Sequence, residues 1–167
     1  MNMQKRPKLN LKITPLELIL NGVTLVLFIG SMVYLLFVWQ TLPSEVPAHY
    51  NALGEVDRWG SKWEMLILPI IATILWIGMT ILEKYPHVYN YINLTEDNVR
   101  NQYLNARLMV NVLKNIITLV FVYLNWKDVQ VALDNEHGLS VWFMPIFLIL
   151  LFVPMGYFII RSVRIKK

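Results

Sequence analysis

Residues 15–39 read PLELILNGVTLVLFIGSMVYLLFVW, an apolar run that carries one charged residue, Glu17. An α-helix rises 1.5 Å per residue, so about 20 such residues cross the hydrocarbon core of a membrane. Three further apolar blocks lie at about residues 64–82, 104–126 and 139–160. We therefore predict an all-α integral membrane protein, in which four spanning helices form a single membrane domain over residues 1–167.

The composition agrees with this prediction. Of the 167 residues, 56% are hydrophobic, which is more than an ordinary soluble domain carries. The first block is longer than the core of a signal peptide and lacks an Ala-x-Ala pattern, so we expect a retained span. The chain has no cysteine, which excludes disulfides, thiolate nucleophiles and cysteine metal sites. The net charge of +4 does not indicate a nucleic-acid partner.

The distribution of basic residues predicts the orientation. Twelve of the fifteen lie before the first block, between or near the second and third, or after the fourth: Lys5, Arg6, Lys8, Lys12, Lys84, Arg100, Arg107, Lys114, Arg161, Arg164, Lys166 and Lys167. Basic residues favour the cytoplasmic side of membrane proteins. We therefore expect a multi-pass protein of the cell membrane with both termini in the cytoplasm.

The same orientation places residues 83–103 in the cytoplasm, as a loop followed by a helix. Thr95 precedes two acidic residues, a pattern typical of a helix start, and we expect this helix to continue into the third span. Thr14 and Glu17 form a capping-box pattern that predicts the start of the first helix. The aromatic and acidic residues of 83–103 suit either a cytoplasmic regulator or packing at the headgroups.

Residues 40–63 form an outer loop that is too rich in special residues to be a plain connector. Prolines 43 and 47 favour extended backbone, and glycines 54 and 60 permit turns with positive φ. The candidate ligand-binding residues of this loop are His49, Asn51, Glu55, Asp57 and Lys62. They either form a site for a small ligand or ion, or they hydrogen-bond one another and shape a surface cap. No pair has the close spacing of zinc ligands, so we predict no metal and no cofactor.

A second candidate feature lies in the third apolar block. Arg107, Asn111 and Lys114 recur at intervals of three and four and so share one face of a helix. Ionisable groups inside a span usually face a bundle interior or a wet cavity, and Glu17 and Glu83 are candidate partners. The alternative is that the long side chains reach the headgroups without further role. We favour that alternative for Arg107 and leave both open for Lys114 and Asn111.

The outer loop also resembles a known family. The residues that carry the resemblance are Pro43, Pro47, His49, Asn51, Gly54, Asp57, Gly60, Ser61 and Lys62. In this order they are similar to the motif of the bacterial membrane domain of unknown function 1648, which forms the front part of the SdpI-like immunity proteins. The resemblance covers the first two spans and their loop. It implies a bacterial cytoplasmic membrane, no known cofactor and no established catalysis, and those proteins have additional spans after this part.

Three functions follow from these features. The first is a non-enzymatic immunity or receptor factor that binds a peptide toxin or small amphiphile at the outer face. The second is a small transporter or transporter subunit, which four spans would form as a homo-oligomer. The third is a membrane hydrolase using His49 with Asp57 or Glu45, but the sequence offers no nucleophile elbow and no His-Glu-x-x-His helix. We expect the first, and no enzyme activity.

Overall fold

A computed structural model describes residues 6–165, so Lys5, Lys166 and Lys167 lie outside the described chain. Its elements are α1 (Pro15–Val38), β1 (Glu45–Tyr50), β2 (Val56–Ser61), η2 (Lys62–Leu66), α2 (Ile67–Leu82), η3 (Pro86–Val88), α3 (Val99–Ala132) and α4 (Phe143–Arg164). Within the described residues, four helical segments are long and apolar enough to cross a membrane: α1, η2 together with α2, α3, and α4. The predicted four-helix membrane protein is therefore confirmed.

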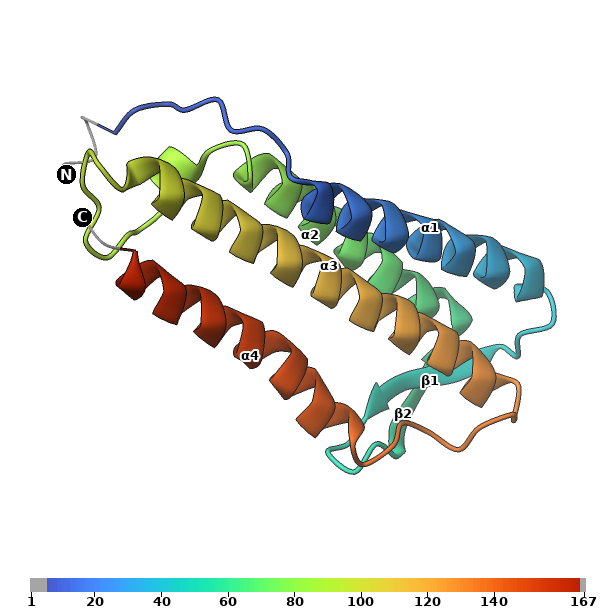
Figure 1. Ribbon diagram of the computed structural model, residues 1–167. Helices are drawn as coiled ribbons and strands as arrows, with labels where there is room; N and C mark the ends of the chain where they lie inside the picture. The colour runs from blue at the N-terminus through green and yellow to red at the C-terminus, as the bar shows by residue number, and fades with distance from the viewer. Residues whose placement is uncertain (1–5, 166–167) are drawn as a thin grey trace.

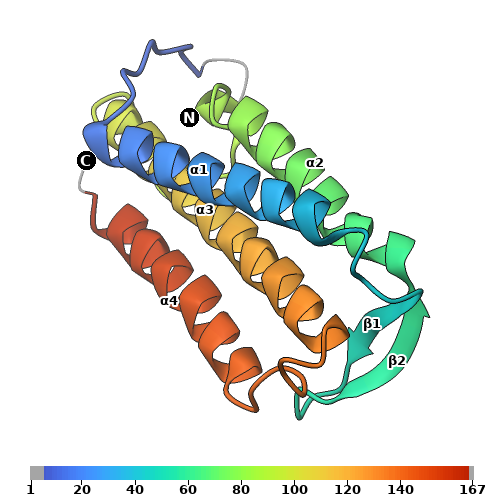
Figure 2. The ribbon, with the colours of Figure 1, turned by 90° about the vertical axis from the view of Figure 1, so that its right-hand side faces the viewer.

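Helix α3 is the centre of the bundle. Helices α1, α2 and α4 each pack against it, with α4 on one side and α1 and α2 on the other (Figures 1 and 2). At the α4 contact, the Gln102 side chain and the backbone and hydroxyl of Ser162 exchange hydrogen bonds, and Asn105 donates to the Phe158 carbonyl. Polar residues of α3 thus hold α4 in place through hydrogen bonds.

The helix ends match the sequence signals in part. At the start of α1, Thr14 and Glu17 form both bonds of the capping box. Helix α3 begins at Val99, after Thr95 and Asn98 exchange hydrogen bonds in a preceding turn, so the predicted start at Thr95 is early. This helix has 34 residues and continues past the predicted third span to Ala132.

The loop between the first two helices contains a β-hairpin, so the fold is not purely α. Strands β1 and β2 pair antiparallel at one end of the bundle, called here the hairpin end (Figure 1). Helix α1 begins and α4 ends at the opposite end, called the termini end. Gly54 in the turn has a φ of +84°, as expected, whereas Gly60 lies in β2 without a positive φ.

Buried contacts anchor the hairpin to the helices. Val46 of β1 is fully buried in a cluster that comprises Leu35, Leu42, Val46, Met65, Val129 and Ala132. The Leu139 N–H also donates to the Gly54 carbonyl, at 2.7 Å, so the hairpin turn holds the segment before α4. Helix α4 consequently begins at Phe143, four residues after the predicted start of the fourth span.

Candidate functional site

Four of the five candidate residues of the outer loop form two separate pairs in the hairpin. His49 Nδ1 lies 2.6 Å from Asp57 Oδ1, and both side chains are exposed. Asn51 donates from Nδ2 to Glu55 Oε2 at 2.8 Å, while its Oδ1 accepts from the N–H groups of Leu53 and Glu55. The Asn51 bonds shape the turn, as the surface-cap interpretation expects. The four residues therefore do not converge on one point.

Lys62, the fifth candidate of the loop, lies apart from these pairs. Its Nζ is 5.4 Å from the centre of the Trp39 ring, which in turn packs against Trp63 at 5.1 Å between ring centres. A lysine over an aromatic face gains a cation–π attraction. Lys62 thus helps to join the end of α1 to the start of the second span.

Beneath the hairpin lies a cavity of about 410 Å³, called here the hairpin cavity. Its wall joins the hairpin to the beginnings of α2 and α4 and to the last turns of α3. Of the five sequence candidates, His49 and Asn51 line it, and Glu55, Asp57 and Lys62 do not. The volume falls within the range of small-molecule sites.

Polar groups that the sequence interpretation missed complete the wall of the hairpin cavity. The Tyr50 hydroxyl donates to Asp128 Oδ1 at 2.7 Å, and Arg58 Nη2 donates to Glu64 Oε2 at 2.9 Å. Burial, followed by the nearby Asp128 carboxylate, raises the pKa of the Tyr50 phenol well above its usual value. No sequence signal connected Tyr50 with Asp128, because Asp128 falls two residues beyond the predicted third span.

The other part of this wall is apolar. It includes Met65 and Leu68 from the second span, Leu124 from α3, and Phe143 from α4. One cavity thus places an ion pair, a histidine and a tyrosine beside hydrocarbon side chains. Such a wall suits a ligand that has both a polar and an apolar part.

The second candidate feature, on α3, is buried and fully paired. Arg107 is 6% exposed, and its Nε and Nη2 bond both oxygens of Glu17 at 2.8 and 2.9 Å. Its other N–H groups donate to the carbonyls of Leu11 and Lys12. The prediction that Arg107 only reaches the headgroups is therefore wrong. A bidentate carboxylate pair is among the strongest side-chain contacts.

Lys114 forms a second buried ion pair, with Glu83. The Nζ–Oε1 distance is 2.7 Å, the Lys114 side chain is fully buried, and Nζ also bonds the Thr80 hydroxyl and faces the Trp76 ring. Asn111 donates to the same Glu83 oxygen at 3.2 Å and to Asn21 at 3.0 Å. Glu17 and Glu83, the two predicted partners, thus each form an ion pair with a residue of α3.

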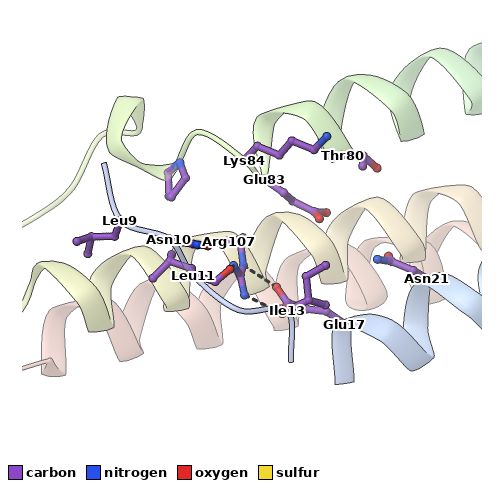
Figure 3. A pocket seen from close by; sticks show the side chains of 11 residues that line it. Leu9, Asn10, Leu11, Ile13, Glu17, Asn21, Thr80, Glu83, Lys84 and Arg107 are labelled. Atoms are coloured by element: carbon purple, nitrogen blue, oxygen red, sulfur yellow. Dashed lines mark hydrogen bonds and ion pairs between the residues drawn. The ribbon is translucent and has the colours of Figure 1, made fainter. Parts of the chain in front are cut away.

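These ion pairs border a cavity of about 330 Å³ at the termini end, called here the termini cavity (Figure 3). Glu17 and Asn21 come from α1, Thr80 from α2, and Glu83 and Lys84 from the residues that follow it. The segment before α1 closes one side with Leu9, Asn10 and Leu11. This segment is held by Arg6, which donates to the carbonyls of His87 and Tyr89.

Within residues 6–165, no group of three or more histidine and acidic side chains is arranged to hold a metal ion. In the same range, the His49 side chain has a single hydrogen-bond partner, Asp57.

Comparison with known proteins supports the resemblance seen in the loop. The family described as "Domain of unknown function (DUF1648)" matches residues 26–73, which run from α1 through the hairpin into α2. An uncharacterized protein from the archaeon Archaeoglobus fulgidus is 30% identical over 131 residues, which cover 70% of this chain and 72% of that protein. No solved structure matches.

Proposed function

For a chain that belongs to the family of the domain of unknown function 1648, whose description names no activity, we propose a non-enzymatic role as a membrane receptor or immunity factor. Its ligand is a peptide toxin or a small amphiphile, bound in the hairpin cavity at the outer face. The observation that carries the proposal is the mixed wall of this cavity. His49 and the Arg58–Glu64 pair contribute polar groups to it, and Leu68 and Phe143 contribute apolar ones.

The position of the cavity favours an amphiphilic ligand. It lies where the hairpin meets the first turns of α2 and α4, so a molecule lying in the membrane surface can reach it from the side. The volume of about 410 Å³ accommodates a few side chains of a peptide rather than a folded domain. Basic residues concentrate at the termini end, which supports an orientation with the hairpin end outside the cell, the side from which a secreted toxin would arrive.

The hairpin offers a matched pair of variants to test this role. His49→Ala and Asp57→Ala each abolish the same His49–Asp57 contact, but only His49 lines the cavity. A bacterium sensitive to secreted peptide toxins would express each variant at equal membrane levels, and survival against a toxin panel would be measured. We expect the wild type and Asp57→Ala to protect, and His49→Ala to lose protection. Equal loss in both variants would instead assign importance to the surface pair.

A second pair of variants fills the cavity without changing charge. Leu68→Trp adds volume inside it, whereas Ile70→Trp adds the same side chain on the exposed, non-lining face of α2. We expect only Leu68→Trp to abolish protection and to weaken binding of the toxin to the purified protein. Failure of the wild type to protect against any toxin would remove the immunity role. It would favour the alternative of a small oligomeric transporter, for which the buried polar residues of α3 are the supporting observation.

A further inference from the structure

The seam between α1 and α2 is open, because both helices pack on α3 and make at most sparse contact with each other in the described chain. Two cavities follow one another along this seam. The first is the termini cavity, which includes Asn21 of α1 and Thr80 of α2. The second, of about 220 Å³, begins one helical turn further on, at Leu25 and Ile77. We call the two together the α1–α2 groove.

The groove changes from polar to apolar along its length. Its termini end holds carboxylates, an amide and a hydroxyl, whereas its inner part is lined mainly by Leu25, Phe28, Ala72, Trp76 and Ile77. Thr118 of α3 lies at the inner cavity as well. Leu25 and Ile77 are 37% and 51% exposed, so this part opens sideways towards the hydrocarbon of the bilayer. A membrane lipid has the same order of polar and apolar parts.

Lys84 is a cation of the groove that has no counterion among the described residues. The carboxylates of Glu17 and Glu83 are neutralised by Arg107 and Lys114. Lys84 also lines the termini cavity, is exposed, and has no ion-pair or hydrogen-bond partner within residues 6–165 (Figure 3). The polar end of the groove therefore carries a free ammonium group, which complements a phosphate.

We propose that the α1–α2 groove binds one anionic phospholipid from the leaflet at the termini end. Its headgroup phosphate lies at Lys84, and one acyl chain runs inward between Leu25 and Ile77. The basic residues around the termini predict that this leaflet is the cytoplasmic one, where anionic lipids attract lysine and arginine. The site is separate from the hairpin cavity, so it stands whether or not the receptor function holds.

Native mass spectrometry of the purified, delipidated full chain tests the charge at the groove. Phosphatidylglycerol and phosphatidylcholine would be added at equal concentration, and we expect one phosphatidylglycerol to bind in preference. Lys84→Gln should weaken this binding about fivefold, the contribution of one lysine near a membrane surface. Arg161→Gln is the control, because Arg161 is an exposed cation at the same end on α4, has no ion-pair partner within residues 6–165, and lines none of the groove. Equal effects of the two substitutions, or no preference between the lipids, would overturn the proposal.

The acyl part of the groove has its own test. Ile77→Trp fills the inner cavity, and Ile74→Trp places the same bulk on the exposed face of α2 outside it. We expect Ile77→Trp alone to reduce phosphatidylglycerol binding at least fivefold. Soluble glycerol phosphate, which lacks the chains, should bind far more weakly than the lipid. If it bound equally well, the site would be one for free phosphate and the lipid proposal would be refuted.

Discussion

The buried pair between Glu17 and Arg107 yields the sharpest prediction of stability. Arg107→Met removes the cation and leaves the Glu17 carboxylate buried, with only its bonds to the Thr14 N–H and hydroxyl. An uncompensated buried charge costs about 3 to 5 kcal/mol. Glu17→Leu leaves the guanidinium without its carboxylate and also removes the Glu17 half of the capping box, the acceptor of the Thr14 N–H, which adds about 1 kcal/mol. We therefore expect losses of about 3 kcal/mol for Arg107→Met and about 5 kcal/mol for Glu17→Leu.

The double variant tests whether the losses of stability of the two single variants are additive. Glu17→Leu together with Arg107→Met removes both charges, and apolar replacement of a buried ion pair is often neutral or stabilising. Only the loss of the carboxylate half of the capping box remains, so we expect a loss of about 1 to 2 kcal/mol. Unfolding in mixed micelles with increasing dodecyl sulfate, followed by circular dichroism, gives the four free energies of the cycle. If Arg107→Met costs less than 1 kcal/mol, or if the double variant equals the sum of the singles, the paired-charge account is refuted.

Two further substitutions test the hairpin end by the same unfolding measurement. Tyr50→Phe removes the donor to the buried Asp128 carboxylate and should cost about 1 to 3 kcal/mol; an unchanged stability would mean that the bond contributes nothing net. Gly54→Ala should cost at least about 2 kcal/mol, because φ is +84° and an added Cβ would clash with the Leu139 carbonyl. The control Gly22→Ala lies in α1, where a Cβ meets nothing within 4 Å, and should be neutral or slightly stabilising.

The architecture could largely be predicted from the sequence, because long apolar blocks in a chain this size have few other interpretations. The capping box at Thr14 even located the start of α1. The hairpin was missed as a sheet, since its strands are short and two of their residues are a proline and a glycine. The end of α3 was placed six residues too early, at Trp126 instead of Ala132, because the residues that follow Trp126 include Lys127, Asp128 and Gln130, which hydropathy assigns to a loop.

For the candidate sites, the sequence identified some of the residues but not how they are paired in space. Glu17 lies within the first apolar block and Glu83 directly follows the second, so both were recognised as possible partners at a similar depth, and α3 pairs with both. The interpretation of Arg107 was wrong, since a position near the end of a span looks the same whether its side chain points outward or inward. Tyr50 and Asp128 are 78 positions apart, and no local pattern indicates such a pair.

The central position of α3 has a consequence for how the protein is made. Glu17 is separated from Arg107 by 90 residues, and α1 and α2 have little contact with each other before α3 exists. At about 5 to 20 residues per second, the ribosome needs roughly 5 to 20 s to supply the cation after the carboxylate has emerged. During that interval Glu17 lacks its Arg107 counterion. We therefore expect the first span to settle in its final position only after the third span has arrived.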